Sequence, residues 1–194
     1  MKILNLYAGV GGNRRLWQGH NITAVELDPK IAAVYKDLYP EDEVIIGDAH
    51  EYLLQHYKEF DFIWSSPPCV THSRLRFTQK TQKYPDMSLY QEIILLKAFF
   101  KGDWVVENVK PYYRPLIEPS FTIDRHMYWC NKTIKPYTAK EETYTNIRDI
   151  SKQMEEAYNI NLDKYVRTIR IRQALRNMVK PEHGLYILNE VTHG

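Results

Sequence analysis

A cysteine stands directly after two prolines at the end of an apolar run. Phe62, Ile63 and Trp64 precede the segment 65–69, which reads Ser-Ser-Pro-Pro-Cys. Prolines restrict the backbone, so Cys69 is expected on a rigid loop at the tip of a strand, where a thiol can act as a nucleophile. The second cysteine, Cys130, has no such neighbourhood, and we expect a buried structural thiol there.

A carboxylate follows another apolar run. Glu107 and Asn108 come directly after Trp104, Val105 and Val106. A charged group at the mouth of a buried parallel strand is costly to desolvate, so it usually has a partner or a chemical role. Glu107 is therefore a second candidate for the site.

Three earlier strand ends carry residues that suit a nucleoside. Residues 7–12 read Tyr-Ala-Gly-Val-Gly-Gly after the first apolar run, Glu26 ends the second and Asp48 follows the third. Glycines let the backbone turn tightly and approach a ligand, and a carboxylate at the second strand accepts hydrogen bonds from ribose hydroxyls. The pattern predicts a nucleoside-binding crevice.

Alternating strand and helix patterns place these residues. Strands are expected at 2–7, 22–27, 43–47, 61–66 and 103–108, with helices at 29–39, 49–60 and 88–100. A strand pair is expected at 121–131, then an irregular polar stretch and helices at 146–157 and 168–178. This order is typical of an α/β fold with a mostly parallel sheet and helices on both faces.

Composition favours one soluble globular domain. The 194 residues are 44% hydrophobic and 26% charged, with a net charge of +2. No run reaches the roughly 18 apolar residues of a membrane span, and the sequence starts in strand-like residues without a signal-peptide pattern. We therefore expect no membrane partner and a cytoplasmic protein, which two cysteines without disulfide or metal spacing also favour.

The ordered motifs resemble those of the DNA cytosine-C5 methyltransferase family. The segments are NLYAGVGGN (5–13), VELDPK (25–30), GDA (47–49), FDFIWSSPPC (60–69) and VVENV (105–109), and the tail at 170–188 is similar to the last family motif. The resemblance implies a Rossmann-like S-adenosylmethionine-dependent fold. It divides the chain into a catalytic and cofactor-binding core (1–130), a reduced target-recognition segment (131–167) and a C-terminal segment packing back on the core (168–194).

The resemblance also implies roles for the catalytic residues. Cys69 matches the thiolate that adds to C6 of a flipped cytosine, and Glu107 matches the carboxylate that bonds the N3 and N4 edge. Asn108 would brace the loop before Cys69, and Arg125 would reach the ring's O2, with His126 as the alternative if the register slips by one.

The implied cofactor is S-adenosylmethionine, with S-adenosylhomocysteine as product. Glycines of the first turn would face its methionine moiety, Glu26 its ribose and Asp48 its adenine amino group. The full set expected at the cofactor is Tyr7, Ala8, Gly9, Gly11, Gly12, Glu26, Leu27, Asp48, Ala49, Pro67, Asn177 and Val179.

The implied partner is double-stranded DNA, bound by a protein that acts as a monomer. Residues expected to contact DNA are Ser73, Arg74, Arg76, Lys80, Lys83, Arg167 and Arg170, and the segment 74–88 would close over the flipped base. Only about 35 residues separate Asn131 from the tail motif, so few side chains can read bases, each discriminating by roughly 1 to 3 kcal/mol. A short target of two to four bases and a phage-like enzyme are expected.

Three departures from the family pattern keep alternatives open. Val70, Thr71 and His72 stand where the family has Gln, a variable residue and Phe, and Arg176 replaces a glycine. A tRNA cytosine-C5 methyltransferase would keep Cys69 and Glu107 unchanged. An N4 or N6 amino methyltransferase would need an aromatic residue after the prolines, and a non-catalytic cofactor- or DNA-binding module would not need both groups.

Overall fold

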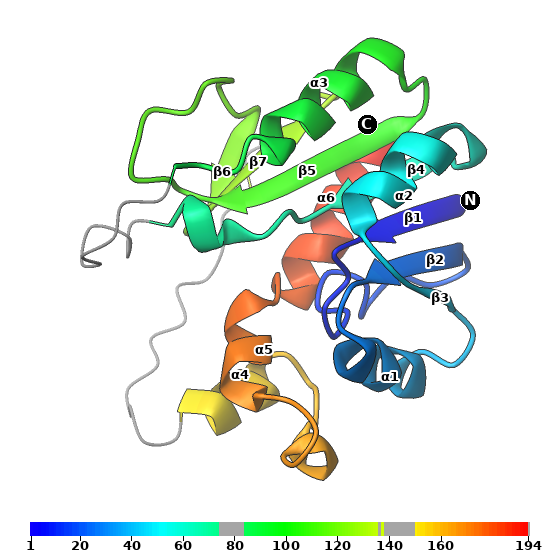
Figure 1. Ribbon diagram of the computed structural model, residues 1–194, viewed down its shortest axis with the longest axis vertical. Helices are drawn as coiled ribbons and strands as arrows, with labels where there is room; N and C mark the ends of the chain where they lie inside the picture. The colour runs from blue at the N-terminus through cyan, green and yellow to red at the C-terminus, as the bar shows by residue number, and fades with distance from the viewer. Residues whose placement is uncertain (74–83, 136, 138–149, 194) are drawn as a thin grey trace.

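The computed structural model describes residues 1–73, 84–135, 137 and 150–193. Seven strands form one sheet in the order β3-β2-β1-β4-β5-β7-β6. The strands are β1 (Lys2–Leu6), β2 (Asn21–Glu26), β3 (Glu43–Ile46), β4 (Phe62–Ser65), β5 (Asp103–Val109), β6 (Phe121–Ile123) and β7 (His126–Cys130). The first five pair in parallel, whereas β7 pairs antiparallel with β5 and with β6 (Figure 1).

Helices cover both faces of this sheet, which confirms the α/β architecture expected from the sequence. The helices are α1 (Pro29–Leu38), α2 (Ala49–His56), α3 (Ser88–Phe99), α4 (Ile150–Ala157), α5 (Ile171–Asn177) and α6 (Pro181–His193). Single 3-10 turns occur at η1 (Tyr57–Glu59), η2 (Cys69–Thr71) and η4 (Asp163–Tyr165). The expected helix at 146–157 starts at Ile150 in the described chain, and the tail adds α6, which we had not predicted as a helix.

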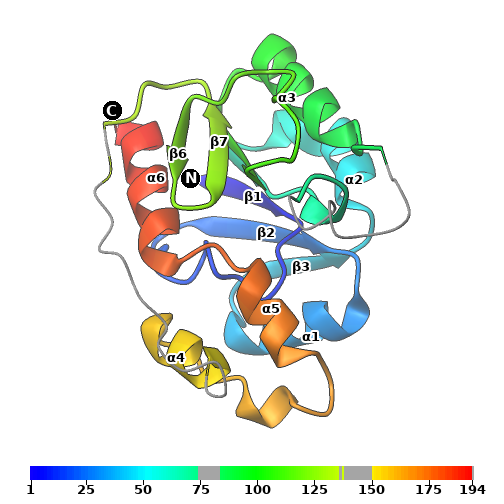
Figure 2. The same ribbon diagram turned by 90° about the vertical axis from the view of Figure 1, so that its left-hand side faces the viewer.

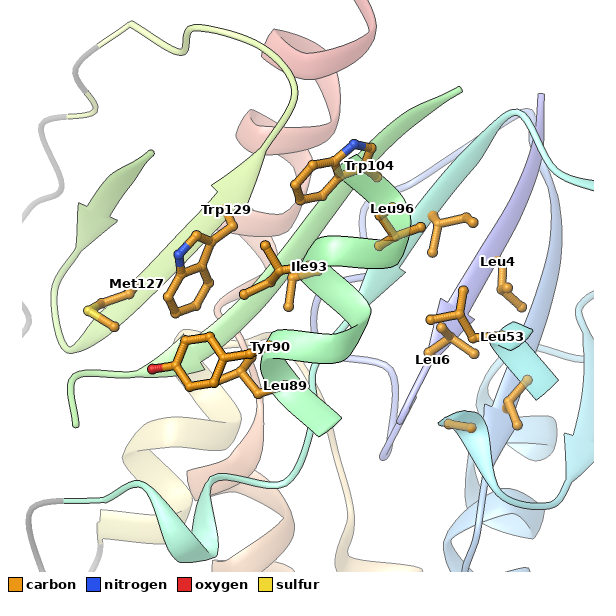
Figure 3. Close-up of a cluster of buried hydrophobic side chains, with 14 residues drawn as sticks. Leu4, Leu6, Leu53, Leu89, Tyr90, Ile93, Leu96, Trp104, Met127 and Trp129 are labelled. Carbon is orange, nitrogen blue, oxygen red and sulfur yellow. The ribbon is translucent and has the colours of Figure 1, made fainter. Parts of the chain in front are cut away.

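Alternating side chains of the central strands build two cores. Leu4 and Leu6 of β1 point to the face covered by α2 and α3, where Ile93 and Leu96 pack with Trp104 (Figure 3). Ile3 points to the opposite face, where a second cluster includes Trp17, Trp64, Tyr128, Ile187 and Leu188. Because α6 contributes the last two of these residues, it packs on that face.

The segment after β7 packs against α1. Met154 of α4, Leu162, Tyr165 of η4 and Leu175 of α5 share a buried cluster with Val34 of α1. Lys164 forms an ion pair with Asp37 of α1 at 2.5 Å. Helices α4 and α5 therefore lie close together in the lower half of both views (Figures 1 and 2).

Strand order fixes where a ligand can bind. Strand β1 leads to β2 on one side, whereas β4 lies on its other side. In open parallel sheets, the crevice outside the carboxyl ends of the strands at such a reversal is the ordinary ligand site. The sequence motifs at the carboxyl ends of β1, β2, β3, β4 and β5 all reach this edge.

In the described part of the chain, no helix is both long and apolar enough to cross a membrane.

Candidate active site

One large cavity opens at the carboxyl ends of the central strands. Its volume is about 1320 Å³. From the predicted site it is lined by Tyr7, Ala8, Gly9, Gly12, Glu26, Leu27, Asp48, Ala49, Pro67, Cys69, Ser73, Glu107, Asn108, Arg125, Arg170, Asn177 and Val179. Residues from five strand ends and from the C-terminal segment therefore meet at a single site.

The turn after β1 is shaped by its glycines. Gly9 has a φ of +56°, and a side chain at this position would meet open space, so its backbone faces the cavity. Gly12 packs closely on the C-terminal segment, since a Cβ there would lie 2.6 Å from the Val179 carbonyl oxygen. The turn thus exposes its backbone to a ligand at Gly9, and at Gly12 it packs against residues 178 and 179.

Gly11 does not line the cavity, although the resemblance implied a cofactor contact. Its φ is +78°, and a Cβ would lie 2.3 Å from a ring carbon of Tyr39. Its carbonyl oxygen accepts a hydrogen bond from the Tyr39 hydroxyl at 2.8 Å. Close packing against Tyr35 of α1 and against Tyr39, which directly follows α1, therefore explains the need for glycine at position 11.

Two carboxylates at the strand ends are held by backbone groups. Glu26 accepts hydrogen bonds from the N–H of Gly9 and of Asp28, each at 2.9 Å and each on a different oxygen. Asp48 caps α2 by accepting from the N–H of Glu51 at 3.0 Å. The glycine turn, Glu26 and Asp48 with their neighbours Tyr7, Ala8, Leu27 and Ala49 are called the cofactor wall below.

The loop that carries Cys69 is braced from the neighbouring strand. Asn108 donates a hydrogen bond from its side-chain amide to the Pro67 carbonyl at 2.9 Å. Cys69 then begins η2, whose end is tied by hydrogen bonds from the N–H groups of His72 and Ser73 to the Cys69 carbonyl. The half-buried thiol therefore lies on a fixed backbone at the cavity.

The pKa of the Cys69 thiol is raised above its ordinary value. Burial is the main cause, the charge of Glu107 adds to it, and the charge of Arg125 opposes it. Glu107 is itself buried, and burial raises its pKa to about 7, against a hydrogen bond from Ser66 and the charge of Arg125. The two groups are electrostatically coupled, so protonation of Glu107 favours the thiolate.

His126 lies beside Glu107, with its Nε2 3.6 Å from a carboxylate oxygen of Glu107. Burial, then the charges of Arg125 and His183, lower the pKa of His126 to about 3. The imidazole is therefore neutral near pH 7, and the contact is not an ion pair. Arg125, by contrast, is exposed and charged, and it donates a hydrogen bond to the Arg176 carbonyl.

Arginines from two segments also line the cavity. Arg125 precedes β7, whereas Arg170, Arg172 and Arg176 lie at or within α5. These four residues are called the arginine wall. Arg167, which we also expected at nucleic acid, is exposed but does not line the cavity.

Several expected contacts cannot be placed. Arg74, Arg76, Lys80 and Lys83 lie outside the described residues, as does most of the expected closing segment. Ser73 is described: it lines the cavity and forms an isolated β-bridge with Pro111.

Sequence reasoning missed a buried acid next to the site. Glu92 of α3 is fully buried and contacts Tyr7, His50 and Ser65. It falls among Leu89, Tyr90, Ile93 and Leu96 on the buried side of α3, so an acid inside an apolar helical stripe was the available signal. Within the described residues no group of three or more His, Cys, Asp or Glu side chains could hold a metal ion.

Comparison with known proteins identifies the family. A family model described as C-5 cytosine-specific DNA methylase matches residues 1–115. A curated tRNA (cytosine(38)-C(5))-methyltransferase of Spodoptera frugiperda is 32% identical over 129 residues, which is 62% of this chain and 39% of the relative. The chain thus spans well under half the length of that relative.

Solved structures are similar over part of the chain. A mutant of Spodoptera frugiperda DNMT2 is 25% identical with a TM-score of 0.43, covering 59% of this chain and 37% of that one. A TehB-like SAM-dependent methyltransferase from Corynebacterium glutamicum is 20% identical with a TM-score of 0.37, covering 56% and 54%.

The cavity fits S-adenosylmethionine, the cofactor of this family. Each Glu26 oxygen accepts one backbone hydrogen bond and keeps a lone pair for a ribose hydroxyl. Open space at Gly9 leaves room for a ligand against the backbone, and one Asp48 oxygen is not used by the helix cap. With the family model covering more than half of its length, from the glycine turn through Cys69 and Glu107, the chain belongs to the C-5 cytosine-specific DNA methylase family.

Proposed function

We propose that this protein transfers a methyl group to C5 of cytosine in DNA through a covalent adduct of Cys69 on a flipped base. One observation carries the proposal: Cys69, Glu107 and Arg125 line the same cavity as the glycine turn and Glu26. A nucleophile, an acid and a nucleoside-binding wall thus face one space. A base inside a duplex cannot reach a thiol in such a cavity, so the target must leave the stack.

The thiolate of Cys69 would add to C6 of the base. Cytosine C5 is a poor nucleophile, and addition at C6 moves the electrons of the C5–C6 double bond towards C5 and the N3 edge. S-adenosylmethionine, when bound, supplies the methyl group that C5 takes up. Loss of the C5 proton to solvent, return of the N3 proton to Glu107 and departure of Cys69 as thiolate then restore the aromatic ring.

Glu107 would supply the proton that this addition requires. Cytosine presents an acceptor at N3 and a donor at its 4-amino group, so a protonated carboxyl can donate to the first and accept from the second. With its pKa raised to about 7 by burial, Glu107 has a large population of the acid form near neutral pH. The raised pKa therefore suits the role.

Protonation of Glu107 would also help to activate Cys69. The carboxylate charge raises the pKa of the thiol, and a neutral Glu107 removes that contribution. Arg125 acts in the same direction, because its charge lowers the pKa of Cys69. A cytosine that binds against the protonated form of Glu107 thus meets a more acidic thiol than it would beside the carboxylate.

The arginine wall supports a polyanionic substrate. Arg170, Arg172 and Arg176 are exposed and line the cavity. Phosphate contacts of this kind bind nucleic acid without reading sequence. With few residues left for base contacts, we propose a target of two to four bases.

A labelled-methyl assay tests the proposal. The protein is incubated with mixed-sequence duplex DNA and methyl-labelled S-adenosylmethionine, and product nucleosides are identified by mass spectrometry. 5-Methylcytosine in DNA is the expected product, and bisulfite sequencing then gives the target. Label in N6-methyladenine or N4-methylcytosine would contradict the role of Cys69, and a six-base target would contradict the short recognition segment.

tRNA is a second candidate substrate. The curated relative that is 32% identical carries the name of a tRNA cytosine-38 C5 methyltransferase. Cys69, Glu107 and the arginine wall would serve either polymer. The same assay on unmodified tRNA separates the two, because label in tRNA but not in DNA would replace the DNA proposal and leave the chemistry unchanged.

A further inference from the structure

A buried carboxylate beneath the cavity joins three of its supporting elements. Glu92 of α3 is 0% exposed. One oxygen lies 2.6 Å from the Tyr7 hydroxyl and 3.0 Å from Nδ1 of His50, and the other accepts from the Ser65 hydroxyl at 2.5 Å. A buried carboxylate is costly unless its oxygens are bonded, and here three donors share it.

Two of these donors belong to the cavity wall, whereas Glu92 does not. Tyr7 and His50 line the cavity. Tyr7 has a φ of 55°, a left-handed conformation that is costly for a residue other than glycine. Its hydrogen bond to Glu92 helps to hold that conformation at the start of the glycine turn.

The geometry defines which nitrogen of His50 faces a ligand. A carboxylate only accepts hydrogen bonds, so Nδ1 of His50 carries the proton it donates to Glu92. The side chain is 20% exposed, and no described residue forms a hydrogen bond with Nε2. Nε2 is therefore the atom that His50 offers to the cavity.

His50 lies two residues after Asp48, which we assign to the adenine. Asp48 and Ala49 immediately precede it at the start of α2, and all three line the cavity. Asp48 suits the exocyclic amino group of adenine, which donates. The ring nitrogens of adenine accept, so they need a donor nearby.

Acidic groups on all sides favour the cationic form of His50. Its hydrogen bond with Glu92 raises the pKa of His50, burial opposes this, and the charges of Glu92, Asp48 and Glu51 raise it further. Asp86, before α3, also lines the cavity, and the charge of His50 contributes to lowering the pKa of that carboxyl. The Tyr7 hydroxyl, bonded to the same Glu92 oxygen as His50, is a further titratable group beside the ring.

We propose that His50 is a cofactor-binding residue whose Nε2–H donates a hydrogen bond to a ring nitrogen of the adenine, and that Glu92 is the positioning residue that orients it. This rests on the proposed use of the cavity for S-adenosylmethionine and adds a residue and a pH dependence to it. Binding then favours the cation. Cofactor affinity falls as the pH rises through the pKa of His50, and the bound cofactor raises that pKa in return.

Calorimetric titration with S-adenosylhomocysteine from about pH 5.5 to 8.5 tests the proposal. For the wild-type protein we expect affinity to fall about tenfold across this range, because neutral His50 has no proton on Nε2 and the charged hydrogen bond to the adenine is lost. His50→Gln should bind more weakly at low pH and lose this part of the pH dependence. Glu107 titrates in the same pH range. The contribution of His50 is therefore the difference between the wild-type and His50→Gln profiles of affinity against pH.

His56→Gln is the matched control. His56 lies in the last turn of the same helix, its Nδ1 is 2.8 Å from a carboxylate oxygen of Glu59, and it is outside the cavity. This variant should keep the wild-type profile. Glu92→Gln should move the midpoint of the profile to lower pH, because it removes the charge that raises the pKa of His50, whereas a merely structural role would weaken binding without moving the midpoint.

NMR titration of the histidine ring protons gives a second readout. The pKa of His50 should rise when S-adenosylhomocysteine binds, and equal values in the free and bound protein would overturn the proposal. A profile of His50→Gln identical to that of the wild type would also overturn it and leave the cofactor site standing. Absence of binding by the wild-type protein at every pH would instead overturn the proposed function.

Discussion

The cofactor wall and the arginine wall line the same cavity but are built in opposite ways. On the cofactor wall, Glu26 is held by two backbone N–H groups and Asp48 caps a helix. On the arginine wall, Arg170, Arg172 and Arg176 are exposed, and within the described chain no carboxylate forms an ion pair with them. The carboxylates of the cofactor wall are thus hydrogen-bonded to backbone groups, whereas the guanidinium groups of the arginine wall remain available to a ligand.

This difference matches the two kinds of ligand proposed for the site. A small nucleoside needs fixed hydrogen-bonding groups, and a wall held by strand ends provides them without reorganisation. A polyanion brings its own charges and releases counterions on binding, so unpaired guanidinium groups favour it. Cys69 and Glu107 line the same cavity as both walls.

Removing the nucleophile tests whether the walls work independently. Cys69→Ala should abolish methylation, because no other described thiol lines the cavity, while affinity for S-adenosylhomocysteine stays unchanged. Methyl transfer and calorimetry on the same preparation check this. Measurable 5-methylcytosine from the variant would refute the covalent mechanism, and Cys130→Ser is the control that should retain activity.

Replacing Glu107 should separate the acidity of the Cys69 thiol from the rate of methylation. Glu107→Gln should lower methylation about 10²- to 10³-fold, because the amide cannot deliver a proton to N3. The same change should lower the pKa of Cys69, since the carboxylate charge that raises it is gone.

Alkylation rates against pH, measured in a Cys130→Ser background, report that pKa. Their midpoint should move to lower pH in Glu107→Gln and stay in place in Glu118→Gln, an exposed acid that pairs with Arg114. For the wild-type enzyme, the acid form of Glu107 is present below about pH 7 and is lost above it, so turnover should decline on the alkaline side. An unchanged alkylation midpoint would show that the two groups are not coupled.

Damage to the cofactor wall should affect cofactor binding alone. Glu26→Ala removes the acceptors for the Gly9 and Asp28 N–H groups as well as those proposed for the ribose. We expect S-adenosylhomocysteine to bind about 10- to 100-fold more weakly, the loss of one to two hydrogen bonds to a charged group. Glu43→Ala, which loses only a bond to Thr23 on the same sheet, should bind normally. Equal affinities in calorimetry would show that the pocket is misplaced.

Substitutions in the arginine wall should have the smallest effect. They should weaken nucleic-acid binding and leave cofactor binding unchanged. Arg170→Gln and Arg172→Gln should each weaken oligonucleotide binding and reduce the slope of log affinity against log salt by about one, without changing cofactor affinity. Fluorescence anisotropy over a salt series measures this. Arg114→Gln is the control, because Arg114 is exposed but already paired with Glu118. A slope that does not change would remove these arginines from the nucleic-acid surface.

Local patterns in the sequence were sufficient for most of the fold. Apolar runs and their flanking polar residues predicted the five parallel strands, and a proline after Asp28 marked the start of α1, where Asp28 accepts from the Lys30 N–H. Helix α6 was not predicted, because its residues were interpreted as part of a motif. Its apolar side chains are buried on the sheet face, a contact between residues distant in sequence.

By itself, the sequence determined the strand ends that carry the glycine turn, Glu26, Asp48, Cys69 and Glu107, since each follows its own apolar run. Only the tertiary structure decided that Gly11 packs against Tyr39 instead of the cavity, and that Glu92 from α3 joins Tyr7, His50 and Ser65. The physical reason is that hydrophobic spacing records which side of an element is buried. Hydrogen bonds and pKa shifts depend on which distant groups meet there.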